Sequence, residues 1–505
     1  MTIPFNDVSA SQRASETFIE LAGVRRSLAG LFIPPRGGLV GQYDASKTAT
    51  VDYVGIKVTS SDDVGLKFGF GSHIHRQALK FPPGVFLQGK GVDAFPLPEE
   101  GGGTAATEDI TFTGTATSSG TLYFGIGGDL VQVAVASGDA FGVVAASLVT
   151  ALTAKQNLAV AGVATDGVVA VTAKGKGTYG NQILLKVNPS GEVQENKNPA
   201  GITTTISIAG GYMASGETDP SVEDVFLTSG GLDALGTNWY TAFTMPLTDA
   251  TNIAFYKTSG DLRSDPAMNR MFGAYGGYVV ESYAAALALP AVTNSKWIGQ
   301  IWENRNESPA FELSAQVVGI ILDEQNQAPN RPYKTLELDG PVDDSVINRS
   351  DLANDALFKA GMSYCKIDAS GALRLGDVAL TYRTNDAGGA TEEWFDAVSL
   401  HARQAKAYSI EQLFLADKYT RAVVVDNDAV TAVTYAIAPK DVVADLTKLV
   451  LDLWVPNVWT KNADAVIASI SAEINAANNG RIDAEITDDE AKALRIIAMR
   501  YAYLF

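Results

Sequence analysis

The sequence is poor in cysteine and in histidine. Cys365 is the only cysteine among 505 residues, so the chain can form no internal disulfide and offers no cysteine cluster for zinc. Only three histidines, His73, His75 and His401, are present, which leaves few candidates for general acid–base catalysis. The first residues contain neither the basic stretch nor the apolar stretch of a secretory signal, so we expect the chain to be made and to fold in the cytoplasm.

Basic residues are also scarce relative to acidic ones. The chain has 38 Lys and Arg against 57 Asp and Glu, a net charge of −19, and nearly all of the acidic excess follows residue 188. A net negative charge of this size repels phosphate backbones and anionic lipids, so we expect no nucleic-acid partner and no membrane partner. The longest nearly uncharged run, residues 271–294, contains Glu281 and Pro290 and predicts a buried helix and loop rather than a membrane span.

The remaining composition predicts a folded chain of several domains. Hydrophobic residues make up 46% of the 505 residues, enough for more than one core. Breaks rich in Pro, Gly and Asn divide the chain. The predicted parts are an N-terminal arm (1–36), an α/β core (37–100 and 218–390), a β-rich inserted domain with linkers (101–217) and a C-terminal domain ending in a strand arm (391–505).

Strands and helices alternate in the predicted core, which indicates a doubly wound α/β fold. Strands are expected at 38–42, 53–59, 240–246 and 277–282, helices at 221–235 and 249–262, and further elements at 295–302, 309–322 and 351–360. After these, helices are expected at 394–415, 440–453 and 463–475, followed by two short strands. The sequence 60–63, Ser-Ser-Asp-Asp, is typical of a helix N-cap with early acidic residues.

The insert has a different composition, rich in Thr, Val and turn glycines and weakly charged. This predicts an autonomous module attached to the main body. Its strands are expected at 111–116, 121–126, 130–136, 168–173, 182–187 and 203–209, with one alanine-rich helix at 140–155.

Two glycine motifs could in principle bind phosphate. Gly175-x-Gly177-x-x-Gly180 has dinucleotide spacing, but an apolar strand-like segment follows it where pyrophosphate binding requires a helix N-terminus. Gly69-x-Gly71-Ser72 enters a predicted helix but lacks the lysine and the spacing of a P-loop. We therefore interpret the first as a turn between strands and the second as a helix-capping turn, and we expect no cofactor.

No other motif indicates catalytic or metal-binding residues. His73 and His75 fall at a predicted helix start, where side chains two residues apart diverge, and His401 reads as a polar residue on a helix face. The residues 426–428, Asp-Asn-Asp, lack the glycine and the glutamate of a calcium loop. The cluster Asp488–Glu490 reads as the charged start of a short helix, and no Gly-x-Ser-x-Gly elbow occurs.

The last residues, 495–505, are strongly apolar and alternate as a strand would. One face holds Ile497, Met499, Tyr501, Tyr503 and Phe505, and the other begins with Ile496. Leaving such a face in water is unfavourable by about 1.5–3 kcal/mol for each large side chain. The strand alone leaves two alternatives open: it closes the chain's own sheet, or it is donated to the sheet edge of a neighbouring subunit.

Several short stretches, taken in order, resemble the tail sheath proteins of contractile phages, in their Mu-like branch. The resemblance covers nearly the whole chain. It is carried by Ile3-Pro-Phe-Asn6, Gly38-Leu-Val-Gly-Gln42, Val58-Thr-Ser-Ser61, Phe68-Gly-Phe-Gly-Ser72, Phe112-Thr-Gly114, Lys176-Gly-Thr-Tyr-Gly-Asn181, Thr248-Asp-Ala250, Tyr382-Arg-Thr-Asn385, Ala438-Pro-Lys-Asp441 and the aromatic C-terminus.

This resemblance implies a structural protein with a subtilisin-like doubly wound core, a β-rich inserted domain and extended N- and C-terminal arms. The subtilisin catalytic motifs are missing: Ser72-His-Ile-His75 stands where subtilases have His-Gly-Thr-His, and the Gly-Thr-Ser motif is absent. The resemblance further implies that the arms link neighbours by strand addition. The expected inter-subunit residues are Phe18, Ile19, Leu21, Ile496, Ile497, Met499, Tyr501, Tyr503 and Phe505.

The implied function is a contractile tail sheath that polymerises around a tail tube and contracts during genome ejection. The expected partners are further copies of the chain in a helical polymer of stacked rings, the tail tube protein, and the baseplate and tail terminator proteins. The expected location is the virion, after assembly in the host cytoplasm. Energy would be stored in a metastable lattice rather than in nucleotide, and the insert would face outward. The alternatives are a surface or adhesin-like β-rich binding protein, or an α/β hydrolase.

Overall fold

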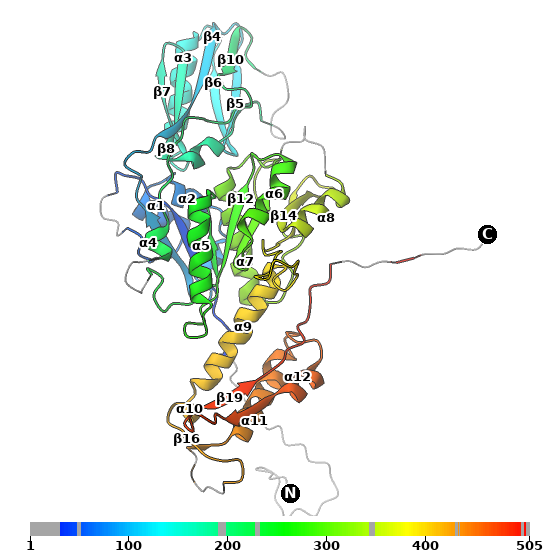
Figure 1. The fold of residues 1–505 in the computed structure, drawn as a ribbon. Coiled ribbons are helices and arrows are strands. Elements are labelled where there is room, and N and C mark those ends of the chain that lie inside the picture. The colour runs from blue at the N-terminus through cyan, green and yellow to red at the C-terminus, as the bar shows by residue number, and fades with distance from the viewer. Residues whose placement is uncertain are drawn as a thin grey trace, which may run out of the picture.

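The computed structural model describes residues 31–47, 52–189, 198–227, 233–342, 349–429, 433, 435–495 and 499–500. Three parts follow one another along the long axis of the molecule (Figure 1). The β-rich insert lies at one end, a large mixed sheet with helices lies in the middle, and a smaller, mostly helical part lies at the other end.

An eight-stranded sheet forms the middle part, in the order β15-β14-β13-β12-β11-β1-β3-β2. The ladders from β14 to β3 are parallel, and the edge strands β2 and β15 pair antiparallel. Because β1 pairs with both β3 and β11, the chain leaves after β3, builds the insert and returns without interrupting the sheet. The strands are β1 (Arg36–Gln42), β2 (Ile56–Val58), β3 (Gly91–Leu97), β11 (Ala242–Thr244), β12 (Gly273–Tyr278), β13 (Ile298–Trp302), β14 (Met362–Ile367) and β15 (Leu373–Asp377).

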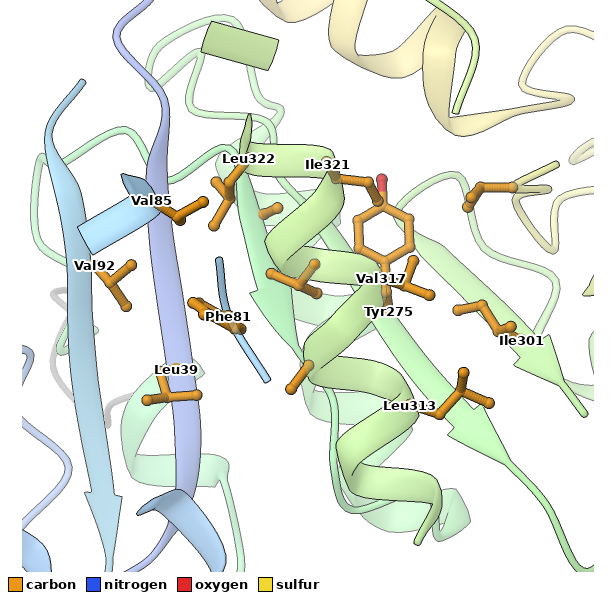
Figure 2. Packing of buried hydrophobic residues seen from close by; sticks show 14 of the residues in the cluster. Leu39, Phe81, Val85, Val92, Tyr275, Ile301, Leu313, Val317, Ile321 and Leu322 are labelled. Atoms are coloured by element: carbon orange, nitrogen blue, oxygen red, sulfur yellow. The ribbon is translucent and has the colours of Figure 1, made fainter. Parts of the chain in front are cut away.

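Both faces of this sheet are buried, as expected of a parallel sheet. Leu39 and Val40, consecutive in β1, point to opposite faces and belong to two different apolar clusters. On the Leu39 side lies α7 (Ala310–Gln327), which is buried on almost every face. Figure 2 shows its side chains between those of β1, β3, β12 and β13: Leu313, Val317, Ile321 and Leu322 face Leu39, Val92, Tyr275 and Ile301.

Five of the other helices in the middle part, α1, α2, α5, α6 and α8, begin at capping side chains. Ser60, Ser72, Asp249, Ser282 and Ser350 each accept a hydrogen bond from a backbone N–H of the first turn. The helices are α1 (Ser61–Phe68), α2 (His73–Ala78), the 3₁₀ turn η2 (Pro83–Phe86), α4 (Glu223–Phe226), α5 (Ala250–Arg263), α6 (Tyr283–Thr293) and α8 (Asp351–Ala360).

The insert contains two sheets, in the orders β10-β4-β8-β7 and β6-β5-β9, with one helix packed on them. The predicted strands and helix are found, and β7 is an additional strand that the sequence did not predict. The elements are β4 (Ala105–Gly114), β5 (Gly120–Ile126), β6 (Asp129–Val135), α3 (Phe141–Ala154), β7 (Val160–Thr165), β8 (Val168–Lys176), the 3₁₀ turn η3 (Thr178–Gln182), β9 (Leu185–Val187) and β10 (Ile202–Ile206).

The insert is joined to the sheet by buried polar contacts, so it is not a loosely attached module. The Arg76 guanidinium pairs with Glu312 at 2.5 Å and with Asp129 of the insert at 2.6 Å. Lys186 of the insert pairs with Glu307 at 2.7 Å. Because Arg76, Glu307 and Glu312 are buried, separating the two parts would leave charges without partners, which is strongly unfavourable.

The motif Gly175-x-Gly177-x-x-Gly180 is a turn, as interpreted from the sequence. It joins β8 to η3, and Gly177 adopts φ +124°, which favours glycine. A Cβ atom at Gly175 would lie 2.0 Å from the Tyr179 hydroxyl. The motif therefore serves to bring the Tyr179 ring inward, against β1 and α7.

The C-terminal part is attached through α9 (Ala397–Phe414), whose first half is buried in the middle part and whose second half packs in a separate cluster with Trp454 and Trp459. The other elements are α10 (Asp417–Thr420), β16 (Val423–Val424), β17 (Ala436–Ile437), α11 (Pro439–Leu449), the π-helical turn η4 (Val450–Trp454), α12 (Ala463–Ser469), β18 (Ser471–Ile474) and β19 (Ile482–Glu485). Among the described residues, no helix is both long and apolar enough to cross a membrane.

Three predicted elements are wrong in extent. The helix predicted over 221–235 is only α4 within the described residues, and Gly230 and Gly231 lie outside them. The helix predicted over 463–475 ends at Ser469, and β18 begins at Ser471. The strand predicted at 277–282 is the end of β12 followed by the cap of α6, because the Ser282 hydroxyl accepts from the Ala285 N–H and starts a helix.

Candidate assembly site

Most of the residues predicted to link subunits lie outside the described residues. These are Phe18, Ile19, Leu21, Ile496, Ile497, Tyr501, Tyr503 and Phe505. Met499 is described: it is 85% exposed and lies in no strand of this chain. The predicted contacts therefore stay a prediction. The structure describes the two segments next to the predicted arms, which we call the N-terminal root and the C-terminal root.

The N-terminal root, residues 31–35, lies between the C-terminal part and the middle part. Ile33 is buried in the apolar cluster that holds Trp454 and Trp459, and the Phe32 ring meets Trp459 edge to face at 5.9 Å. The Lys90 N–H donates to the Pro35 carbonyl at 2.8 Å. These contacts fix the chain just before β1.

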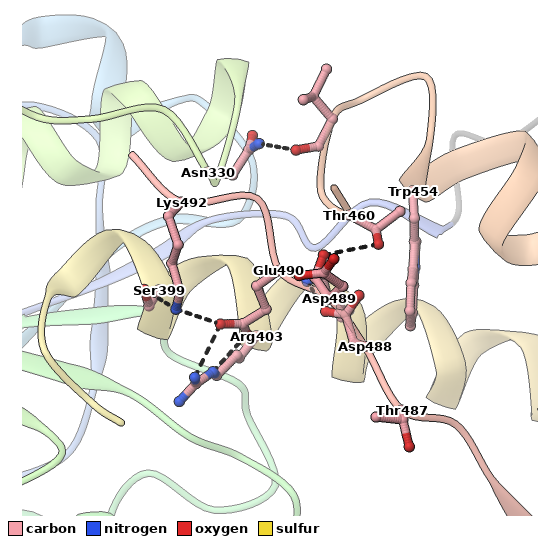
Figure 3. A network of polar contacts seen from close by, with 12 residues as sticks. Asn330, Ser399, Arg403, Trp454, Thr460, Thr487, Asp488, Asp489, Glu490 and Lys492 are labelled. Carbon is pink, nitrogen blue, oxygen red and sulfur yellow. Dashed lines mark hydrogen bonds and ion pairs between the residues drawn. The ribbon is translucent and has the colours of Figure 1, made fainter. Parts of the chain in front are cut away.

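The C-terminal root, residues 486–495, is an extended segment that lies along α9 (Figure 3). Arg403 of α9 donates to both carboxylate oxygens of Glu490, at 2.7 and 3.0 Å, and Lys406 pairs with Asp488. The backbone is held as well, because the Lys461 N–H donates to the Asp489 carbonyl at 2.7 Å. The prediction that Asp488–Glu490 starts a helix is wrong. Glu490 and Asp488 instead pair with Arg403 and Lys406 of α9, which are distant in the sequence.

Charge pairing also holds the end of this root on the middle part. The Arg495 guanidinium donates to Asp377 and to Asp396, each at 2.7 Å, and lies over the rings of Phe358 and Phe395. Burial raises the pKa of Asp377, and Arg495 opposes this rise. These contacts hold the chain beside α8 as far as Arg495.

Glu490 is the most strongly stabilised anion of the C-terminal root. Burial alone would raise its pKa, but hydrogen bonds and charge from Arg403 and Lys492 outweigh burial and lower the pKa to about 2. Lys492 adds a 2.9 Å contact to the same carboxylate. The carboxylate thus stays ionised, and the pairing stays in place, across the neutral and mildly acidic range.

Replacing Glu490 with glutamine is expected to loosen the C-terminal root without unfolding the body. Charged hydrogen bonds of this kind contribute about 1.5–3 kcal/mol, so amide exchange of residues 487–492 should accelerate roughly tenfold or more. Hydrogen-exchange mass spectrometry measures this. The control Asp355→Asn breaks the exposed Asp355–Lys359 pair of α8 and should change exchange little. Unchanged exchange at 487–492 in Glu490→Gln would contradict this account of the root.

The three histidines are buried, and each has a lowered pKa. Burial lowers the pKa of His73 to about 3, and the ring stacks on Tyr179 at 3.9 Å. Burial, with the Arg76 charge, lowers the pKa of His75 to about 4, and its Nδ1 accepts from the Gly71 N–H at 2.9 Å. The described residues include no group of three His, Cys, Asp or Glu side chains placed to hold a metal ion.

The interpretation of His401 as a polar helix-face residue is wrong. His401 is 1% exposed, and its pKa is lowered to about 4 by burial. Its Nε2 lies 2.7 Å from the Tyr275 hydroxyl and its Nδ1 2.8 Å from Oε1 of Gln404. The helix α9 turns this side chain toward β12, and the sequence of α9 alone does not reveal that contact.

A hollow of about 630 Å³ lies between α4 and α5. Its charged lining is Asp233, Arg263, Asp265 and Arg270, and the first two form a 3.0 Å ion pair. The described residues that line it include no histidine, serine or cysteine. The described lining of the hollow therefore holds no Ser–His or Cys–His pair of the kind that activates a nucleophile in hydrolases.

Comparison with known proteins agrees with the family resemblance. No protein-family model matches the chain. The chain is 24% identical over 418 residues, 81% of each protein, to the Mu-like prophage FluMu tail sheath protein of Haemophilus influenzae. Similar solved structures include the sheath tail protein of Listeria innocua, with TM-score 0.45, 11% identity and coverage of 90% of this chain and 95% of that one. A chain of the contracted anti-feeding prophage baseplate gives TM-score 0.45, 10% identity and coverage of 98% and 99%. The chain is thus a relative of the Mu-like phage tail sheath proteins.

Proposed function

We propose that this chain is the structural subunit of a contractile tail sheath. It polymerises around a tail tube and contracts to drive the tube through the host envelope. The observation that carries the proposal is the 24% identity to a Mu-like tail sheath protein over four fifths of both chains. The buried histidines support a structural rather than an enzymatic role.

Within this proposal, residues 37–100 and 218–390 form a subtilisin-like sheath core, 101–217 an outward-facing insert, 391–505 a C-terminal sheath domain and 1–36 an N-terminal arm. The continuous eight-stranded sheet supports grouping the two core segments. The buried ion pairs of Arg76 and Lys186 support motion of core and insert as one rigid body during contraction.

Within this proposal, the sheet β18–β19 accepts the arms of neighbouring copies. Among the described residues it has only two strands, so each has an edge free of backbone partners. Isolated two-stranded hairpins are marginally stable, and an added strand stabilises them through main-chain hydrogen bonds. Ala472 and Ile482 pack on the apolar cluster that holds Trp454 and Trp459. This contact covers the inner face of the two-stranded sheet, so a further strand can pair only along its edges.

The proposed partners are other copies of the chain, the tail tube protein, and the baseplate and terminator proteins, with no nucleic acid and no membrane. The proposed location is the virion, after assembly in the host cytoplasm. With a net charge of −19, copies repel one another at long range, so assembly should strengthen as salt screens that repulsion.

Purified full-length chain should form rings or tubes that are visible by negative-stain electron microscopy. Sedimentation velocity should show particles far larger than the 53.2 kDa monomer. Compact monomers at every protein concentration and salt concentration, with and without the co-expressed tube protein, would contradict the proposal.

A further inference from the structure

The helix α6 carries no charged side chain, although one side of it lies at the surface. Ala284, Ala288 and Val292 are exposed, Val292 by 83%. The uncharged run that the sequence singled out is therefore only partly explained by burial. This outer side calls for an apolar contact that the single chain does not supply.

The exposed side continues onto α8, which packs against α6 (Figure 1). The Tyr283 hydroxyl donates to the Ala353 carbonyl at 3.1 Å, and the neighbouring Leu352 is 79% exposed. We name this surface the α6 face: Val280, Ala284, Ala288, Val292 and Leu352. An apolar surface of this kind on a soluble protein marks a contact site.

Charges at the edge of the α6 face are already paired. Asp355 pairs with Lys359, and Asp351 with Lys366, each at 2.6 Å. Elsewhere the chain carries a net charge of −19, so most of its surface repels another copy. A charge-free face can be removed from water against a second copy without burying unpaired charge.

The position of the C-terminal root indicates which molecule covers the α6 face. Arg495 lies over the Phe358 ring of α8, with its guanidinium carbon 5.3 Å from the ring centre, so the arm leaves beside the helix pair. Residues 496–505, fully extended, reach about 34 Å. A copy that takes up this segment as a strand must therefore lie within that distance of α8.

We propose that the α6 face is buried against a second copy of this chain, the copy that receives the C-terminal arm. The inference rests on the proposed function, because it requires polymerisation through the arms. It goes further because it assigns a second contact between the same two copies: an apolar contact between their folded bodies, in addition to the contact made by the extended arm. The arm keeps the two copies together, and the α6 face fixes how their bodies meet.

Thiol labelling tests this assignment in the assembled protein. Cys365 is fully buried, so a cysteine introduced by Val292→Cys is the main site for a maleimide dye. Val292→Cys should react at least tenfold more slowly in polymers than in monomers. The control Val163→Cys, on β7 of the insert and 68% exposed in the native valine, should react at the same rate in both. Equal rates for Val292→Cys in polymer and monomer would overturn the inference.

A charge-insertion variant gives a second, independent readout. Ala288→Glu combined with Val292→Glu places two anions on the exposed side, so the fold should survive and the protein concentration needed for polymers should rise at least tenfold. Val163→Glu is the matched control and should polymerise as the unmodified chain does. Polymers of the double variant at the unmodified concentration would overturn the inference alone, whereas no polymer from the unmodified chain would overturn the proposed function with it.

Discussion

Replacing Tyr179 with alanine is expected to lower the free energy of unfolding by about 3–5 kcal/mol, the cost of removing a buried aromatic side chain. Tyr179 belongs to the insert, but its ring is buried among side chains of the middle part. It stacks on His73 at 3.9 Å and meets Phe311 edge to face at 5.7 Å. Its hydroxyl donates to Oε1 of Gln42 at 2.8 Å.

The matched variant Tyr179→Phe keeps the ring and removes only the hydrogen bond to Gln42, so it should cost about 1 kcal/mol. Urea unfolding of both variants separates packing from hydrogen bonding. An alanine variant as stable as the phenylalanine variant would show that the insert is not anchored here. A deletion of most of the insert, residues 110–188, would also remove Tyr179 and its contacts with the middle part. An experiment that asks whether the insert is needed for assembly should therefore retain residues 174–183.

Acidification from pH 7.5 to pH 5 is expected to destabilise the fold through its three buried histidines. In the folded chain their pKa values are about 3, 4 and 4, and in the unfolded chain about 6.5. The unfolded state therefore binds more protons once the pH falls below about 6.5. Stability should be unaffected by these groups above that pH and should fall between pH 6.5 and pH 4, by about 1.4 kcal/mol per pH unit for each imidazole.

The variant His401→Gln isolates this contribution. Glutamine keeps a polar group near Tyr275 but does not titrate, so the loss of stability per pH unit should shrink by about a third, whatever the variant's stability at pH 7.5. Urea midpoints at pH 7.5, 6.5, 5.5 and 5.0 give the slope. An unchanged slope would mean that His401 titrates normally in the folded chain.

Local signals in the sequence predicted several element positions. The element expected at 351–360 has these bounds and is a helix, since Ser350 caps its start and Gly361 in the left-handed region ends it. The capping turn at Ser72 is also confirmed by the hydrogen bond from the His75 N–H. Strand order is not a local property: β1 lies between β3 and β11, and nothing near residue 36 specifies the second partner.

The errors concern residues whose environment is set by distant segments. His401 looks polar and exposed until β12 brings Tyr275 to it, and Asp488–Glu490 look like a helix start until α9 brings Arg403 and Lys406. The insert looked autonomous because its composition differs, whereas its attachment depends on a few residues such as the half-buried Asp129 and the buried Tyr179.

The family resemblance predicted more about function than any single site residue did. Short motifs in a fixed order identified the Mu-like sheath branch, and the Haemophilus relative confirms this. The linking residues predicted near the two ends, Phe18, Ile19 and Leu21 and those from Ile496 to Phe505, stay a prediction, and their proposed contacts lie between copies. A strand that is donated to another copy has no partner in its own chain, so its role is tested in the polymer.

The most direct test of the proposed strand exchange compares the full-length chain with a variant that ends at Arg495, by negative-stain electron microscopy. The truncation keeps Glu490 and Arg495, and with them the ion pairs to Arg403, Asp377 and Asp396, so the variant should remain folded. We predict rings or tubes from the full-length chain and folded monomers from the variant. Polymers from the truncated chain, or its unfolding, would contradict the account, because the C-terminal strand would then be dispensable for assembly or part of the chain's own fold.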